Sequence, residues 1–323
     1  MLGIGPKIRA FLGTADIGQK LRAVELAVAD LAARYDASLS ATTPSTPAPR
    51  RPGPTVVFMG DGRLLCRLVI PEIYDPDIIY LLDAADRLLV PRIAMEGVYE
   101  RDSTRFVIRH LGEHSHCIDI GANFGYFTCI MARRAWRGRT IAVEADPELF
   151  EQLRDNIHIN WSEKAVTALN RAAADRAGTL RFWRRRSRAA NTSIVLPDAE
   201  ALAITGEPPP EPFDVEAIRV DDLLDELKGR VDLLKIDVEG AEPLVLRGAR
   251  ATLAHNPQLA ILMEWSPEQL RAAGFAPSEF ASELQESGLR PYLLLTDGEI
   301  EPITWDQLRA ADYLNIVLLS QGM

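Results

Sequence analysis

Asp119 and Glu144 each lie at the end of an apolar run, where a strand is expected to end. The stretch CIDIGANFGYFTC around Asp119 contains Gly121 and Gly125, which leave the backbone free to turn tightly and to approach a ligand. The residues that follow, FGYFTCIMARR, begin a predicted helix whose first N–H groups point toward this turn. The pattern therefore predicts a site for a small polar molecule.

Two classes of ligand suit such a turn: a dinucleotide, or a nucleoside without phosphates. A dinucleotide requires the spacing GxGxxG, whereas Gly121 and Gly125 are spaced GxxxG, and Asp119 would repel a diphosphate. Glu144 can accept hydrogen bonds from both hydroxyls of a ribose. It precedes Asp146, which is predicted to cap a helix that begins with Pro147. These features favour S-adenosylmethionine, a cation with a free amino group and a ribose diol.

A second pair of carboxylates, Asp237 and Glu264, ends the apolar runs VDLLKI and LAILME. Ligands of an open α/β sheet bind outside the carboxyl ends of its strands, so both carboxylates are expected to face the sulfonium from one rim. Methyl transfer to a hydroxyl requires alignment and the removal of one proton. Asp237 is the first candidate for the base, and the alternative is that it holds the amino group of the methionine.

Lys235 lies on the same strand face as Asp237, because side chains alternate along a strand. A lysine in so apolar a run requires a carboxylate partner, and Glu264 or Glu239 is expected to provide it. Asp237, Glu239 and Glu264 could instead hold Mg²⁺ through their oxygens, although no histidine or ordered spacing supports a metal site.

The basic run RFWRRRSRAANTS stands out from the acidic average of the chain. Four of its arginines, together with Trp183, could bind an anionic acceptor such as a uronate, a sugar phosphate or a lipid-linked glycan; they are Arg184, Arg185, Arg186 and Arg188. The alternative is a loop with solvated charges.

The elements that position these residues alternate between strand and helix from His116 onward. This alternation predicts a parallel, doubly wound α/β sheet over residues 114–323, with room for an antiparallel edge strand. Residues 55–113 are predicted to form a lead-in of a hairpin and helices, in which Ser103 or Thr104 caps a helix that ends at Leu111.

The N-terminal region is predicted to consist of a helix and a linker. Residues 1–36 contain an a/d seam suited to a short coiled coil or to an amphipathic helix on its own domain, made of Ile17, Leu21, Val24, Val28, Leu31 and Tyr35. Residues 37–54 are rich in Ala, Ser, Thr and Pro and are predicted to be a linker. We expect the helix to mediate homo-oligomer formation.

The composition excludes several classes of protein. The chain has 323 residues and a formal net charge of -10, so broad electrostatic binding of nucleic acid is not expected. Its three cysteines show no CxxC spacing, which fits a reducing cytoplasm rather than a disulfide framework or a zinc ribbon. No uncharged apolar run approaches the ~18 residues of a membrane span. The composition does not exclude peripheral contact of the protein with a membrane.

Several segments of the chain resemble the FkbM-type methyltransferases, a family of class I enzymes that depend on S-adenosylmethionine. The resemblance covers about Thr55 to Leu319 and is carried by DRLLVPRIAMEGVYERDSTRF, DIGANFGYFT, VEADPELFEQLRDNIHIN, NRAAADRAGTL, LLKIDVEGAEPLVLRGA and ILMEWSP. The combination of DIGANFGY with KIDVEGAE is more specific than either motif alone. It implies a Rossmann-like methyltransferase domain.

The resemblance also implies roles for individual residues. Those expected at the methionine side of the cofactor are Asp119, Gly121, Ala122, Asn123, Gly125, Tyr126 and Thr128, while Glu144 is expected at the ribose and Asp175 near the adenine. Glu100 also matches a family position and is expected to cover the acceptor site. Independently of the resemblance, Glu239 and the arginines Arg184 and Arg186 of the basic run are expected at the acceptor. Asn156 and Asn160 match family positions too, and we interpret them mainly as hydrogen bonders at a helix end.

The function expected on these grounds is O-methylation that depends on S-adenosylmethionine. The resemblance suggests a sugar hydroxyl of a glycan, glycolipid or lipid-linked saccharide as the acceptor, or alternatively a hydroxyl of a polyketide or macrolide. Two other classes remain to be distinguished: a non-catalytic scaffold that binds S-adenosylmethionine, and an NAD-linked dehydrogenase.

Overall fold

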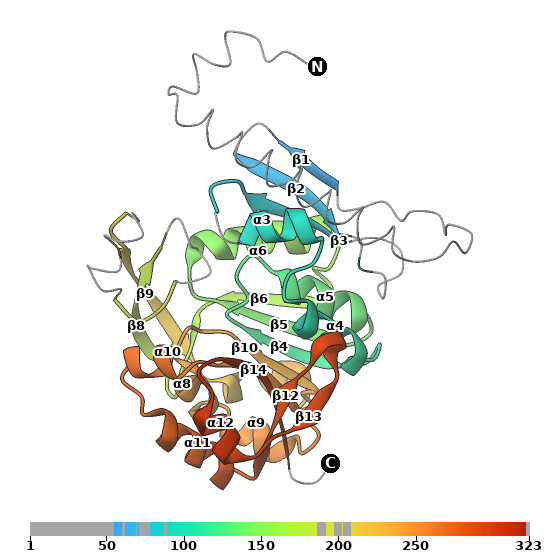
Figure 1. Ribbon diagram of the computed structural model, residues 1–323. Coiled ribbons are helices and arrows are strands. Elements are labelled where there is room, and N and C mark those ends of the chain that lie inside the picture. The colour runs from blue at the N-terminus through green and yellow to red at the C-terminus, as the bar shows by residue number, and fades with distance from the viewer. Residues whose placement is uncertain are drawn as a thin grey trace, which may run out of the picture. The chain divides into compact units, whose positions relative to one another are not determined.

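The computed structural model describes residues 55–59, 62–68, 70, 78–86, 89–185, 192–196, 202 and 208–320. Its centre is an eight-stranded sheet (Figure 1). In spatial order the strands are β13 (Ile300–Pro302), β12 (Leu289–Leu294), β14 (Leu314–Ser320), β11 (Ala260–Trp265), β10 (Leu233–Ile236), β4 (His116–Ile120), β5 (Arg139–Glu144) and β6 (Val166–Asn170). The five strands from β11 to β6 are mutually parallel, and β14, β12 and β13 pair antiparallel. The predicted fold class is confirmed, with an antiparallel edge of three strands.

Two strand–helix units of the parallel part have helix starts that agree with the sequence. α5 (Tyr126–Arg134) follows β4, and α6 (Pro147–Ile159) follows β5. The side chain of Asp146 caps α6 and accepts a hydrogen bond from the backbone N–H of Glu148 at 2.8 Å. Both helices start at the carboxyl ends of their strands, so their N-termini lie at the same edge of the sheet.

The C-terminal half supplies the helices between the remaining strands. These are α8 (Glu242–Arg247), α9 (Arg250–His255), α10 (Pro267–Ala272), α11 (Pro277–Glu286) and α12 (Trp305–Ala310), with the short 3₁₀ turns η2 (Val220–Leu223), η3 (Asp225–Leu227) and η4 (Thr296–Gly298).

Alternate residues of the central strands pack into two separate cores. On β10, Leu233 belongs to the core that contains Phe106 and Phe127, whereas Leu234 belongs to the core that contains Val245. The sheet is therefore buried on both faces, which explains the unbroken apolar runs of its parallel strands. Side chains of Asp119, Lys235, Asp237 and Glu264 share the face of Leu233, because strand positions two apart point the same way and Lys235 pairs in register with Asp119.

The segment before the central sheet forms a small sheet and two helices. β1 (Thr55–Phe58), β2 (Arg63–Leu68) and β3 (Ile78–Asp83) pair antiparallel, and α3 (Leu89–Glu96) and α4 (Arg101–His110) follow. α4 begins at Arg101 after Glu100, so the prediction that Ser103 or Thr104 caps it is wrong. Both residues are buried within the helix, where the Thr104 hydroxyl donates to the carbonyl of Tyr99 at 2.7 Å instead.

Asn156 in α6 and Asn160, which follows its last residue, bind this small sheet to the central domain. The Asn156 side chain accepts from the N–H of Leu81 at 2.6 Å and donates to its carbonyl at 3.1 Å. Asn160 makes the same pair of hydrogen bonds with Ile79, at 3.0 and 2.7 Å. Their main role is therefore to satisfy the free edge of β3, not only the end of the helix as the sequence suggested.

A third, small sheet stands beside the carboxyl ends of the central strands. It consists of β7 (Ala172–Ala173), β8 (Gly178–Arg184) and β9 (Glu211–Ile218), in the order β7-β9-β8. The predicted N-terminal helix and linker, residues 1–54, lie outside the described residues, so both stay predictions.

Candidate active site

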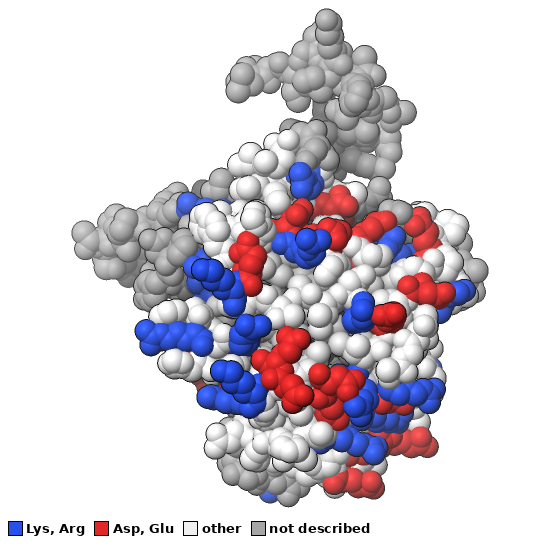
Figure 2. Space-filling view, turned by 180° about the vertical axis from the view of Figure 1, so that it is seen from behind, with Lys and Arg blue, Asp and Glu red and all other residues white. Residues whose placement is uncertain are grey.

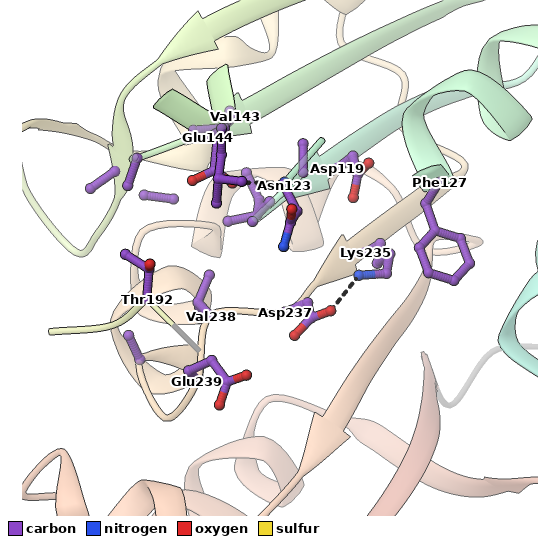
Figure 3. Close-up of a pocket in the computed structure, with 18 of the residues that line it drawn as sticks. Asp119, Asn123, Phe127, Val143, Glu144, Thr192, Lys235, Asp237, Val238 and Glu239 are labelled. Atoms are coloured by element: carbon purple, nitrogen blue, oxygen red, sulfur yellow. Dashed lines mark hydrogen bonds and ion pairs between the residues drawn. The ribbon is translucent and has the colours of Figure 1, made fainter. Parts of the chain in front are cut away.

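One pocket lies at the carboxyl ends of β4, β5, β10 and β11, and encloses about 1020 Å³ of empty space that is partly open to solvent. Nine of the predicted site residues line it: Asp119, Gly121, Ala122, Asn123, Tyr126, Glu144, Asp237, Glu239 and Glu264. Figure 3 shows Glu144 and Asn123 on one side and Lys235 with Asp237 toward the other. The pocket therefore has two chemically different ends.

Glu144 is held in place by backbone N–H groups. One carboxylate oxygen accepts from Asn123 at 2.7 Å, and the other accepts from Asp146 at 2.8 Å. Burial raises the pKa of Glu144 to about 7, although these hydrogen bonds oppose the rise. A carboxylate oxygen can accept two hydrogen bonds, so each oxygen retains one lone pair for a ligand.

Asp119 is buried and lies on β4 at the same edge. Its Oδ2 accepts a hydrogen bond from the Thr128 hydroxyl at 2.6 Å, while its Oδ1 is buried and has no partner among the described residues. Burial raises the pKa of Asp119, and the nearby Lys235 ammonium opposes that rise. A buried carboxylate oxygen without a partner is costly, so Oδ1 is suited to a ligand with a hydrogen-bond donor.

The two glycines of the turn serve different purposes. Gly121 has φ +75°, and a Cβ there would lie 1.9 Å from the backbone oxygen of Asp237. Gly125, with φ +93°, precedes α5 and packs against Leu153, where a Cβ would lie 2.7 Å from Cδ1. Gly121 therefore sets the distance between β4 and β10, whereas Gly125 lies outside the pocket lining and sets the contact between α5 and α6.

Gly121→Ala is expected to destabilise the protein by at least about 2 kcal/mol, because the left-handed backbone and the clash with Asp237 both act against the methyl group. The measurement is chemical unfolding followed by circular dichroism. Gly178→Ala is the matched control, since nothing lies within 4 Å of a Cβ at that position. Equal stability of the two variants would contradict this account of Gly121.

Tyr126 and Thr128 support the site from within α5. The Tyr126 hydroxyl accepts from the backbone N–H of Tyr99 at 3.0 Å, and its ring stacks on Tyr80 with centroids 5.5 Å apart. Thr128 is fully buried and is absent from the pocket lining. Thr128 therefore positions Asp119, and Tyr126 joins the α3–α4 segment to the pocket wall.

A buried ion pair occupies the other end of the pocket. Lys235 Nζ donates to Asp237 Oδ2 at 3.0 Å and lies 4.7 Å from the centre of the Phe127 ring. Burial alone would lower the pKa of Lys235, but Asp237, Asp119 and Glu100 together raise it. The prediction that Glu264 or Glu239 pairs with Lys235 is therefore wrong, because Asp237, two residues along the same strand face, is nearer. The Glu239 side chain accepts instead from Gln269 on α10.

Glu264 extends the acidic end of the pocket. Burial raises its pKa to about 7, and the negative charge of Asp237 adds to this rise. The Tyr313 hydroxyl donates to its Oε1. Glu100, just before α4, interacts electrostatically with Lys235 and Asp237, and burial raises its pKa too. Asp119, Asp237, Glu100 and Glu264 thus all interact electrostatically with the one ammonium of Lys235. Glu100 is not part of the pocket lining, and its place at the acceptor stays a prediction.

Comparison with known proteins identifies the family. The family model described as Methyltransferase FkbM domain matches residues 119–291, which is more than half of the chain. The chain belongs to the FkbM methyltransferase family. It is an S-adenosylmethionine-dependent methyltransferase, and the predicted family, enzyme class and cofactor are confirmed.

Two named relatives share this class. The FkbM protein is 29% identical to Methyltransferase sdnD from Sordaria araneosa over 213 residues, which cover 58% of this chain and 82% of the relative. It is 29% identical to Methyltransferase 1 from Beauveria bassiana (strain ARSEF 2860) over 153 residues, or 42% of this chain and 59% of the relative. A solved structure of Methyltransferase FkbM from Methylobacillus flagellatus KT is 12% identical, with a TM-score of 0.39, over 64% of this chain and 44% of that chain.

Arg184 of the basic run has a different role from the one predicted. Arg184 is nearly buried and binds both oxygens of Asp146 at 2.6 Å, and it contacts Glu148 at 2.6 Å. It is therefore engaged within the protein and does not line the pocket. Arg186 lies outside the described residues. Asp175 lies in the turn after β7, also outside the pocket lining, and interacts electrostatically with Arg247.

Several pocket residues were not anticipated from the sequence. Tyr99, Arg171 and Thr192 line the pocket, and Tyr313 reaches Glu264 from the loop before β14. Tyr99 and Arg171 lie inside segments that carry the family resemblance, and Thr192 lies inside the basic run. The antiparallel pairing of β14 with β11 brings Tyr313 close to Glu264, and no local sequence pattern predicts this contact.

Among the described residues, no group of three or more His, Cys, Asp or Glu side chains is arranged to hold a metal ion. Asp237 and Glu239 have separate protein partners, as described above. We expect excess EDTA to leave turnover of the methyltransferase unchanged, compared with EDTA already saturated with Mg²⁺. A loss of turnover that added Mg²⁺ restores would contradict this expectation.

The charged side chains of one face of the molecule are of both signs. Figure 2 shows acidic and basic side chains interspersed with uncharged ones on one face. None of the helices in the described ranges is both long enough and apolar enough to span a membrane. The three cysteines are buried and unpaired.

Proposed function

We propose that this methyltransferase acts on a hydroxyl group of an uncharged, polyhydroxylated acceptor, with a sugar of a glycan, glycolipid or lipid-linked saccharide as the substrate class. The proposal rests on one observation: the same pocket is lined by Glu144 and Asp119, which we call the cofactor end, and by Asp237 and Glu264, which we call the acidic end.

The cofactor end fits S-adenosylmethionine. The oxygens of Glu144 each retain a lone pair for a ribose hydroxyl, and the unpartnered Oδ1 of Asp119 suits the amino group of the methionine. Both carboxylates also favour a cation over a neutral or anionic ligand.

The acidic end favours an uncharged acceptor. Glu100, Asp237 and Glu264 carry the charge there, and Lys235 is already paired with Asp237. An anionic acceptor would meet like charge in a partly buried site, which is unfavourable. This argues against the uronate or sugar phosphate expected from the basic run, since Arg184 is bound to Asp146. A sugar hydroxyl, by contrast, can donate to any of these carboxylates.

The proton acceptor in this proposal is Glu264 rather than Asp237. Asp237 is already engaged in an ion pair with the buried ammonium of Lys235 at 3.0 Å. Protonation of Glu264 would instead relieve repulsion from Asp237. Because the pKa of Glu264 is raised to about 7, its carboxylate is well suited to general base catalysis near neutral pH.

The proposed reaction is balanced in atoms and charge. S-adenosylmethionine supplies an activated methyl group, whose bond to sulfur breaks as its bond to the acceptor oxygen forms. Glu264 takes the hydroxyl proton, and Asp237 with Lys235 orients the reacting groups. The positive charge of the sulfonium and the negative charge of Glu264 are thereby both lost.

The test is methyl transfer from tritiated S-adenosylmethionine to three sets of acceptors: neutral methyl glycosides and disaccharides, the matching uronates, and macrolactones with free hydroxyls. We expect label in the neutral sugars and a much lower rate with the uronates. If only the macrolactones were labelled, the acceptor would be a natural-product hydroxyl and not a sugar hydroxyl. Faster labelling of the uronates would contradict the electrostatic argument.

A further inference from the structure

One wall of the pocket comes from outside the central sheet. Leu180 and Phe182 on β8 line the pocket, together with Thr192 and Ile194 from the segment that follows β8; we call these four residues the hairpin wall. Leu180 and Phe182 are two positions apart on one strand, so both point to the same side. The wall therefore adds a largely apolar surface with a single hydroxyl.

The hairpin wall is tied to the loop that carries Glu144. Arg184, on the same face of β8 as Phe182, binds Asp146 through two hydrogen bonds of 2.6 Å. The backbone N–H of Asp146 in turn donates to Glu144 at 2.8 Å. The side chains of Arg184 and Asp146 are only 12% and 2% exposed, so solvent screens this pair weakly. The position of the wall is thus coupled to the proposed ribose carboxylate.

Thr192 is the polar member of the wall. Its neighbour Ser193 is fixed to β8, because its carbonyl accepts from the backbone N–H of Trp183 at 2.9 Å. The Thr192 Oγ1 is buried and has no hydrogen-bond partner among the described residues. Figure 3 shows Thr192 at the Glu144 end of the pocket, away from Lys235 and Phe127. Rotation about χ1 can direct this hydroxyl into the pocket.

We infer that the hairpin wall binds the adenosine part of the cofactor, with Thr192 as a hydrogen-bonding residue and Phe182 and Ile194 as apolar contacts. This inference rests on the proposed placement of the cofactor with its ribose at Glu144. A threonine hydroxyl both donates and accepts, so it suits a ribose hydroxyl or a ring nitrogen of adenine. The wall thereby gives Arg184 a positioning role at the cofactor end, in place of a role at the acceptor.

The test uses S-adenosylhomocysteine as the probe and calorimetry as the measurement, so it needs no acceptor. Thr192→Val keeps the shape of the side chain and removes the hydroxyl, and we expect the Kd to rise about fivefold. Thr179→Val, at an exposed position of the same hairpin, is the matched control and should bind as the wild type does. An unchanged Kd for Thr192→Val would overturn the assignment of Thr192.

A second pair of variants tests the anchor. Arg184→Gln should raise the Kd at least fivefold, whereas Arg181→Gln, which removes an exposed pair with Asp214, should not. Thermal unfolding of both variants shows whether each is folded, and Arg184→Lys replaces Arg184→Gln if the latter is not. If the wild type binds S-adenosylhomocysteine and both Thr192→Val and Arg184→Gln bind it equally tightly, the role of the hairpin wall is refuted but the placement of the cofactor is not. Absence of binding to the wild type would refute the placement of the cofactor itself.

Discussion

Glu264→Gln is expected to lower kcat by about two to three orders of magnitude, the usual contribution of a general base. The substitution keeps the size of the side chain and the contact with Tyr313 but removes the proton acceptor. The measurement is kcat with a neutral sugar that the wild type methylates, together with the Kd for S-adenosylhomocysteine. We expect that Kd to change less than about threefold, since Glu264 lies at the acceptor end.

Glu268→Gln is the matched control, because Glu268 is exposed on α10 only a few residues away. It should leave both kcat and Kd unchanged. If Asp237→Asn removed activity while Glu264→Gln retained most of it, the base would be Asp237 and the assignment above would be wrong.

The same assignment has a consequence for pH dependence. A base must be ionised, and burial raises the pKa of Glu264 to about 7, so kcat should be maximal above that pH and fall below it. The hydrogen bond from Tyr313 lowers this pKa. Tyr313→Phe should therefore move the acidic limb of the profile to higher pH, while Tyr292→Phe, a half-buried position on β12, should not. If the acidic limb of the pH profile did not move in Tyr313→Phe, that limb would report the ionisation of another group, such as Glu144.

Glu144→Gln is expected to raise the Kd for S-adenosylmethionine and S-adenosylhomocysteine about 100-fold. Two charge-assisted hydrogen bonds to a ribose diol contribute about 1.5 kcal/mol each at the lower end of their range, and 1.4 kcal/mol is a factor of ten. The new amide NH₂ would also face one of the two backbone N–H groups that now donate to Glu144. Two donors cannot pair, so the loop itself is weakened.

Calorimetry measures this loss, and thermal unfolding without ligand separates it from a general loss of stability. Glu151→Gln, at an exposed position of α6 where Glu151 pairs with Arg154, is the matched control and should bind normally. Binding by Glu144→Gln within a factor of five of the wild type would show that the ribose is held elsewhere.

The local sequence was sufficient for the central sheet and the cofactor end of the pocket. Each strand–turn–helix unit there is continuous in the chain, so an apolar run followed by a glycine turn or a capping aspartate specifies it directly. The cap of α6 by Asp146 and the position of Glu144 at the end of β5 followed from such local patterns. The clustering of Asp237 and Glu264 at one rim followed from the rule for parallel sheets.

Only the tertiary structure decided the partners of the charged side chains. Lys235 pairs with Asp237, Arg184 pairs with Asp146, and Tyr313 reaches Glu264, although each sequence interpretation had assigned other partners or none. An ion pair or a hydrogen bond depends on distances of a few ångströms between segments far apart in the chain, which residue types and spacing do not specify. The turns that carry Asp119 and Glu144 were therefore local in origin, whereas the partners of Lys235, Asp146 and Glu264 were set by the fold.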